Sequence, residues 1–379
     1  MMPKPAVLTV LLTAAAALVV TAVVARTCYV HGANRASDLS VEWSPRKAAS
    51  YLDQREVWWQ QWPRAQKDHG TVCISCHTNV PYALVRPGLQ RQLDERAAPA
   101  VEARLLASVE TRVHGWSQMV PFYSDAVSGA GKTAQSHSTE AVLNAILLAS
   151  NDQGEPSLRP VTRAALGNAW ALELPTGGWL WQDFHLGPWE SVESSYQAAA
   201  LLLLEVESST GGYAGDPGVR DHVALLRVYL QQQYTAQPFM NQLYMLWASA
   251  KTPGLLTPGQ HDSLVKQLQV LQQVDGGWRL CALDKTERLD DSPEPTVSDG
   301  MATALAVLAL EESGTPPADP TLRRGLAWLE HHQEPAGNWS SSSLNKDRDP
   351  ASNAGLFMSD AATAYAVLAL QRAAVLAAR

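Results

Sequence analysis

Gln272-Gln-Val-Asp-Gly-Gly-Trp278 joins two helical segments of very different character. The segment before it, residues 258–273, is amphipathic and carries its charged side chains on one face. The segment after it, Thr296–Glu312 (TVSDGMATALAVLALEE), is apolar on nearly every face. A helix that is apolar all round is buried on all sides, whereas an amphipathic helix covers a core. This stretch therefore predicts an outer helix, a tight corner and an inner helix.

The residue types of the corner suggest how it is built. Glycine readily adopts the left-handed conformation in which many helices end, so we expect the glycine at the helix exit. The tryptophan then covers the end of the helix. The glutamine side chain is placed to bond the backbone groups that a helix end leaves unpaired.

The same unit recurs along the chain, as it does in repeat proteins. Close copies are residues 319–334 ending in Gln333-Glu-Pro-Ala-Gly-Asn-Trp339, with inner segment 357–372, and residues 157–174 ending in Glu173-Leu-Pro-Thr-Gly-Gly-Trp179, with inner segment 190–205. Weaker copies are residues 97–116 with 136–150, and residues 219–234 with 241–250. Five hairpins of alternating outer and inner helices predict an all-α, double-walled ring, an α/α-toroid.

A second strong signal precedes the repeats, in Cys73-Ile-Ser-Cys76-His77. This C-x-x-C-H is typical of a site where one haem c is attached covalently. Two thiols at this spacing can add to the two vinyl groups of one porphyrin, and the adjacent His77 can ligate the iron. The alternatives are half a zinc site, a thioredoxin-like dithiol or coincidence. A zinc site needs a second pair of ligands, whereas Cys28 and Cys281 are isolated.

The haem segment itself resembles a sixth hairpin. Residues 75–83 align, to within a residue or so, with the starts of the inner segments at 296–302 and 359–366. The motif would then lie at the N-terminus of an inner helix, with the haem at one mouth of the ring. The alternative, a separate cytochrome-c domain over residues 45–95, has too few residues for a stable core. We therefore expect 45–95 and 96–379 to form one domain.

The N-terminus predicts export. Residues 6–25 are apolar and uncharged between Lys4 and Arg26, which is long enough to span a bilayer. Residues 1–26 are thus interpreted as a signal anchor or a cleaved signal peptide, and residues 27–44 as a polar linker. The remaining chain is expected on the periplasmic side of the cytoplasmic membrane, where c-type haem is attached in bacteria.

Composition and net charge bear on the kinds of partner that the protein can bind. The 379-residue chain has a net charge of −8, which gives no electrostatic reason to bind nucleic acid. It is 46% hydrophobic, enough for a sizeable core, and its 13 Trp against 4 Phe fit a repeated structural role for tryptophan.

The corners at Gln272–Trp278 and Gln333–Trp339 resemble the QW motifs of squalene-hopene and oxidosqualene cyclases. The resemblance covers roughly residues 97–375 and implies the α/α-toroid that these cyclases share with protein prenyltransferase β subunits. It does not imply their activity. The D-x-D-D acid of the cyclases is absent from the sequence, the cyclases have two helical barrels in a longer chain, and the zinc ligands of the prenyltransferases are not recognisable.

Acidic residues recur near the predicted starts of inner helices, where they would ring one end of the lumen as catalytic acids. The alternative is structural, because acids at helix N-termini cap free N–H groups and complement the helix dipole. These residues are Glu140, Glu193, Asp299 and Asp360. Aromatic residues in the loops between paired helices are candidates to line a site for an apolar ligand or to pack against neighbouring corners. They are Phe122, Tyr123, Trp181, Phe184 and Trp189.

A closed ring would place the hairpins with His114, Met119 and His137 on one side of the haem and the hairpin with Met358 on the other. These four are the candidates for a sixth iron ligand. A Met ligand favours electron transfer, whereas an open position allows chemistry on peroxide or small gases.

Three functions are compatible with this sequence. The leading hypothesis is haem redox chemistry, with a redox partner protein and an apolar, isoprenoid-like ligand in the toroid. The second is a non-redox cyclase or lyase in which the haem is structural. The third is a binding or scaffold module.

Overall fold

The computed structural model describes residues 43–284 and 288–378. In these residues twelve long helices pair in chain order into six hairpins, each with an outer and an inner helix. The outer helices are α2 (Pro45–Gln61), α4 (Ala100–His114), α7 (Pro160–Ala171), α9 (Arg220–Gln233), α11 (Pro258–Leu271) and α14 (Pro320–His331). The inner helices are α3 (Asn79–Gln92), α6 (Lys132–Asn151), α8 (Ser194–Ser208), α10 (Phe239–Ser249), α13 (Gly300–Glu312) and α15 (Phe357–Ala377). Two short helices, α5 (Asp125–Ser128) and α12 (Leu280–Leu283), lie in the loops.

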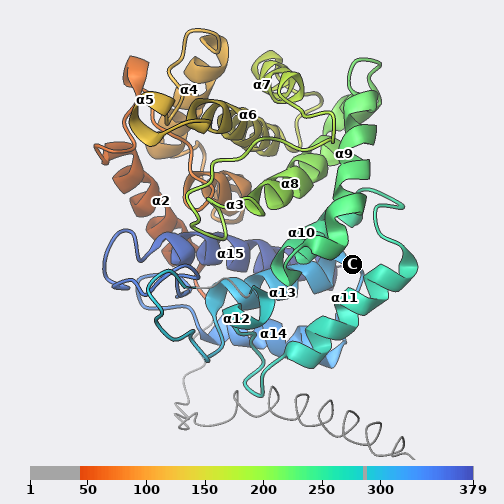
Figure 1. The fold of residues 1–379 in the computed structure, drawn as a ribbon. Coiled ribbons are helices and arrows are strands. Elements are labelled where there is room, and N and C mark those ends of the chain that lie inside the picture. The colour runs from red at the N-terminus through yellow and green to blue at the C-terminus, as the bar shows by residue number, and fades with distance from the viewer. Residues whose placement is uncertain (1–42, 285–287, 379) are drawn as a thin grey trace, which may run out of the picture. The chain divides into compact units, whose positions relative to one another are not determined.

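The inner helices form a closed ring. Each packs against the next, from α3 through α6, α8, α10 and α13 to α15, and α15 packs against α3 again. Figure 1 shows the first and last hairpins side by side, with α2 in red beside α15 in blue. The predicted α/α-toroid of about six hairpins is therefore confirmed, and α2 and α3 form the first of the six.

The two layers have the predicted burial. Every residue of α13 from Gly300 to Glu311 is buried, as expected of a helix that is apolar all round. The outer helix α11 buries only Leu264 and Leu268 and turns its polar face outward. In every hairpin the outer helix comes first and the inner helix second. The N-termini of all inner helices therefore lie at one mouth of the ring, and their C-termini lie at the other.

The tryptophan of each clear corner binds the end of its own outer helix. The indole Nε1 atoms of Trp179, Trp278 and Trp339 donate to the carbonyls of Ala169, Leu268 and Leu329, each at 2.8 Å. The acceptor lies ten residues earlier in all three cases. The indole covers the helix end, as predicted, and it also satisfies a carbonyl that the helix end leaves unpaired.

The corner glutamine ties one hairpin to the next. Gln272 Nε2 donates to the carbonyl of Gly276 and to that of Thr321, which begins the next outer helix, both at 2.8 Å. Gln333 repeats this contact, donating to the carbonyls of Gly337 and Ser44. Ser44 caps α2, so the last corner is tied to the first helix.

The predicted role of the corner glycine was wrong in one respect. Gly276 and Gly337 lie beyond the helix ends at Leu271 and His331, so they do not form the helix exit. Their φ angles are 96° and 102°, and they bring the loop against the next outer helix. A Cβ atom on Gly337 would lie 2.2 Å from the carbonyl oxygen of Lys47 in α2.

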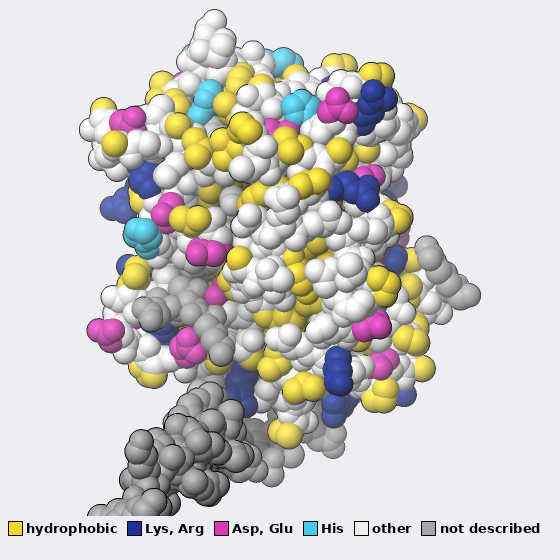
Figure 2. All heavy atoms as spheres, turned by 45° about the vertical axis from the view of Figure 1, so that its right-hand side comes forward, with side chains coloured by type: hydrophobic (Ala, Val, Ile, Leu, Met, Phe, Trp, Pro, Cys, Tyr) yellow, Lys and Arg dark blue, Asp and Glu magenta, His cyan; other side chains and the backbone are white. Residues whose placement is uncertain are grey.

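The predicted signal segment and most of the linker, residues 1–42, lie outside the described residues. No helix in the described ranges is long and apolar enough to cross a bilayer. On the face drawn in Figure 2, acidic and basic side chains are scattered singly, without a broad area of one sign.

Gly337→Ala is expected to weaken ring closure. A left-handed alanine costs roughly 1–2 kcal/mol, and overpacking against α2 adds about 1–3 kcal/mol. Gly314→Ala is the matched control, because Gly314 has a φ of 81° but no atom within 4 Å of the added Cβ. Urea unfolding of both variants measures the difference, and equal losses of stability would contradict the role given to Gly337.

Candidate functional site

The C-x-x-C-H motif lies in the short segment that leads from α2 into α3. Backbone bonds hold this segment, since Cys73 N donates to the carbonyl of Ala65 and Trp59 Nε1 donates to the carbonyl of Cys73, both at 2.8 Å. Ser75 Oγ accepts the N–H groups of Thr78 and Asn79 and so satisfies donors at the start of α3. The motif therefore precedes the first turn of an inner helix, at one mouth of the ring.

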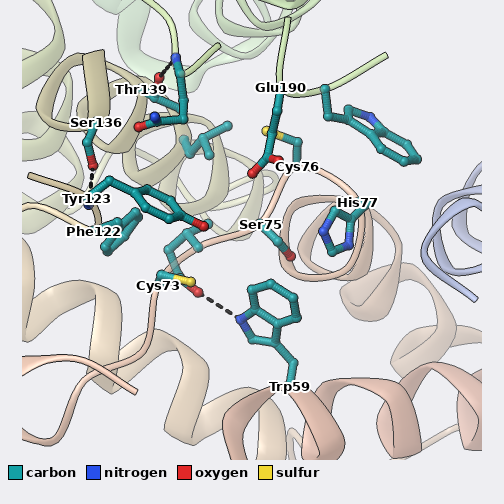
Figure 3. Close-up of a pocket in the computed structure, with 14 residues that line it drawn as sticks. Trp59, Cys73, Ser75, Cys76, His77, Phe122, Tyr123, Ser136, Thr139 and Glu190 are labelled. Carbon is teal, nitrogen blue, oxygen red and sulfur yellow. Dashed lines mark hydrogen bonds between the residues drawn. The ribbon is translucent and has the colours of Figure 1, made fainter. Parts of the chain in front are cut away.

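Both cysteines and the histidine line one cavity (Figure 3). The space open to a water-sized sphere is about 50 Å³, within about 490 Å³ of empty volume that includes the opening. Its walls are largely aromatic, with Trp59, Phe122, Tyr123 and Trp189. Burial raises the pKa of the Cys73 thiol to about 12 and raises that of Cys76 as well. Both thiols are therefore protonated at neutral pH, unlike the thiolate of a redox dithiol.

His77 is packed among aromatic rings. Its ring stacks on Phe357 at a centroid distance of 3.9 Å and meets Trp59 and Trp189 at 5.2 and 5.5 Å. Burial lowers the pKa of His77 to about 3, so the imidazole is neutral. Its Nδ1 atom lies 2.8 Å from the hydroxyl of Thr78.

Two polar side chains in the cavity were not predicted. Gln182 is only 4% exposed, and neither atom of its amide has a hydrogen-bond partner among the described residues. Burial raises the pKa of Glu190, which also lines the cavity. Both belong to the loop between α7 and α8, whose aromatics had been singled out from the sequence. No local sequence pattern marks these two residues. They reach the cavity only because the loop between α7 and α8 returns over the mouth of the ring.

A second, smaller space adjoins the first, deeper in the ring. It is open to a water-sized sphere over about 20 Å³ and shares Cys76, Leu143 and Trp189 with the first cavity. Tyr244 and Tyr365 close it, with their hydroxyls 3.1 Å apart. Cys76, Leu143 and Trp189 thus form the wall that the two spaces share.

Asp299, Asp360 and Glu193 lie at the starts of inner helices, as predicted, whereas Glu140 does not. Asp299 is the N-cap of α13 and accepts from the N–H groups of Met301 and Ala302. Asp360, in the first turn of α15, pairs with Arg55 at 2.7 Å. Glu140 lies in the middle of α6 rather than at its start, and pairs with Arg112 at 2.5 Å. Glu193 is exposed at the start of α8 and lines a separate cleft of about 550 Å³ with Gln197 and Asn241.

None of the four candidate sixth ligands lines the cavity. His114 is exposed at the end of α4, and Met119 packs over Gly115. His137 stacks on Trp116 at 4.1 Å and has a buried Nε2 without a partner among the described residues. Met358 is buried in α15.

The predicted loop aromatics gather around the cavity. Phe122, Tyr123 and Trp189 line it, and Trp181 lines the smaller space and donates to the carbonyl of Trp189 at 2.8 Å. Phe184 packs edge-on against Tyr123 and lies under Lys132. In the described ranges no three His, Cys, Asp or Glu side chains converge as a set of metal ligands.

No protein-family model matches the sequence, and no curated protein matches it. Among solved structures, a polysaccharide lyase aligns over 88% of this chain and 99% of its own, with 13% identity and a TM-score of 0.53. The unsaturated glucuronyl hydrolase of Bacillus sp. GL1, responsible for the degradation of glycosaminoglycan, aligns over 87% of this chain and 96% of its own, with 11% identity and a TM-score of 0.51. At these identities the likeness shows the α/α-toroid fold alone.

Glu140→Gln is expected to lower the free energy of unfolding by about 3 kcal/mol, because it leaves the fully buried Arg112 without its main counter-charge. Glu193→Gln is the control and is expected to change stability by less than about 0.5 kcal/mol, since Glu193 is exposed. Chemical denaturation measures both. An unchanged stability in Glu140→Gln would contradict the structural role given to this acid.

Proposed function

We propose that the mouth of the ring holds one covalent haem c and that the protein has a haem-dependent redox function. Cys73 and Cys76 would carry the two thioether bonds and His77 would ligate the iron. One observation carries the proposal: both thiols and a neutral imidazole line a single cavity with aromatic walls. A thiol, a second thiol and a histidine at this spacing are the donor set of a c-type haem site.

The residues around the motif fit the group chemically. The unpartnered amide of Gln182 is a buried donor and acceptor that a ligand in the cavity could satisfy. The enclosed space of about 50 Å³ holds only a few water molecules, far less than a porphyrin. Binding therefore requires the loop that carries Trp189 and Glu190 to move away from the mouth, which would join the two adjacent spaces.

The bound haem would supply one-electron chemistry, and the chain would set its conditions. Trp59 and Phe357 pack against the ring of His77 and would keep water away from it. A dry, aromatic surrounding and the hydrogen bonds of the axial histidine are the means by which a protein tunes such a centre.

The other predicted ligands remain proposals. The apolar, isoprenoid-like ligand would need more room than the two adjacent spaces beside the motif offer. A groove of about 450 Å³ at the opposite mouth, lined by Trp247, Leu308 and Leu368, suits it better. A redox partner and periplasmic, membrane-anchored placement stay predictions from the motif and from residues 1–26. The resemblance to triterpene cyclases supports the shape of the corners and no activity.

The test is the absorption spectrum of the full chain produced with a c-type haem maturation system. We expect a covalent c-type spectrum with a reversible redox couple, and a shift on adding carbon monoxide, because no described His or Met other than His77 lines the cavity. Cys73→Ala with Cys76→Ala should abolish covalent attachment, and Cys281→Ala should retain it. A wild-type chain that folds but carries no covalent haem would refute the proposal.

A second candidate is a non-redox lyase or hydrolase in which the haem is structural. The observation that favours it is Glu190, a buried carboxyl whose raised pKa suits a general acid, in a toroid like those of carbohydrate-active enzymes. Unsaturated glycosaminoglycan disaccharides are the probe. Turnover that survives loss of both cysteines and disappears in Glu190→Gln, with Asp183→Asn as control, would favour this function. A scaffold module predicts no turnover and no redox couple.

A further inference from the structure

A continuous chain of hydrogen bonds ends at His77. Tyr51 Oη and Arg55 Nε donate to Asp360 Oδ1 at 2.8 and 2.7 Å. Thr78 Oγ1 donates to Asp360 Oδ2 at 2.8 Å, and His77 Nδ1 lies 2.8 Å from the same Thr78 oxygen. The chain therefore runs from the outer helix α2, through the inner helix α15, to the residue after the C-x-x-C-H motif.

Counting protons along this chain fixes the histidine tautomer. Asp360 is paired with a buried guanidinium, so its carboxylate only accepts hydrogen bonds. The Thr78 hydroxyl has one proton, which it gives to Asp360, and so it can only accept from His77. In a neutral imidazole, a proton on Nδ1 leaves the lone pair on Nε2. The hydrogen bond of the His77 ring is made by Nδ1, and His77 lines the cavity.

We propose that Thr78 is a positioning residue that holds His77 in the Nδ1–H tautomer and transmits the charge of Asp360 to it. The tautomer of His77 is a property of the chain alone. The effect of Asp360 on a bound iron rests on the proposed function. A histidine that ligates a metal commonly donates its other N–H to such a partner, which orients the ring and makes the ligand more basic.

The position of Asp360 is itself fixed by ring closure. Arg55 donates with Nη1 to the Asn353 side chain at 2.7 Å and with Nη2 to the Asn353 carbonyl at 2.9 Å. The guanidinium thus binds the loop before α15 and the first turn of α15 together. Asp360 is only 1% exposed, so its charge acts on Thr78 with little screening by water.

The consequence for a bound haem is a lower reduction potential. A more basic axial imidazole stabilises ferric relative to ferrous iron, because it donates more electron density. Loss of the Thr78 hydroxyl would cut this connection while leaving His77, Cys73 and Cys76 in place.

The first test uses the full chain made without haem and labelled with ¹⁵N-histidine. We expect the His77 Nδ1 resonance to be that of a protonated nitrogen and Nε2 that of an unprotonated one. Thr78→Val should lose this bias and Thr78→Ser should keep it. Thr162→Val is the matched control, since Thr162 is fully buried and its hydroxyl has no partner among the described residues. A wild-type His77 protonated on Nε2 would overturn the proposal whether or not haem binds.

The second test is potentiometry of the haem-loaded full chain. Thr78→Val should raise the potential, whereas Thr78→Ser and Thr162→Val should not. Tyr51→Phe removes a competing donor to Asp360 but keeps the ion pair between Asp360 and Arg55. The carboxylate should then accept more strongly from Thr78, so the reduction potential should fall. Equal potentials in wild type, Thr78→Val and Tyr51→Phe would overturn the role in tuning. Absence of covalent haem in the wild type would instead refute the proposed function and leave the tautomer result standing.

Discussion

The contact between the last and the first hairpin is the constraint on which the rest of this structure depends. A toroid of repeated hairpins has two ends that each expose an apolar face, and only their mutual burial removes both. Here the contact between the last and the first hairpin, called the seam below, contains specific hydrogen bonds and an ion pair as well as apolar packing. Gln333 binds Ser44 at the start of α2, Gly337 packs on the same helix, and Arg55 pairs with Asp360 of α15. The C-x-x-C-H motif follows α2 directly, so closure of the ring also builds the site.

Placing the motif at this seam has a chemical consequence. Its histidine is contacted by Trp59 of α2 and Thr78 before α3, from its own hairpin, and by Phe357 of α15, from the far end of the sequence. An isolated segment of about 50 residues would surround this histidine less well, since small domains bury a lower fraction of their surface. The toroid supplies the aromatic surroundings that such a short segment would lack.

Much of this arrangement follows from local patterns. The Ala-rich segments are apolar all round, so their place in the inner ring was predictable, as was the position of Trp339 over the end of its outer helix. Other features depend on contacts between distant residues. Gly276 serves close packing rather than a helix exit because the neighbouring outer helix lies against it. Glu140 and Asp360 are bound by Arg112 and Arg55, and no spacing along the chain reveals such partners. Gln182 and Glu190 enter the site only because a long loop returns over the mouth.

The central claim is that the haem binds inside the mouth of the ring rather than on its outer surface. The most direct measurement is a crystal structure of the haem-loaded full chain, with the iron located by its anomalous scattering. The account predicts iron on Nε2 of His77, Thr78 still bonded to Nδ1, and Trp189 displaced from between the two spaces. A haem attached to Cys73 and Cys76 but lying outside the ring, with Trp189 in place and His77 unligated, would contradict it.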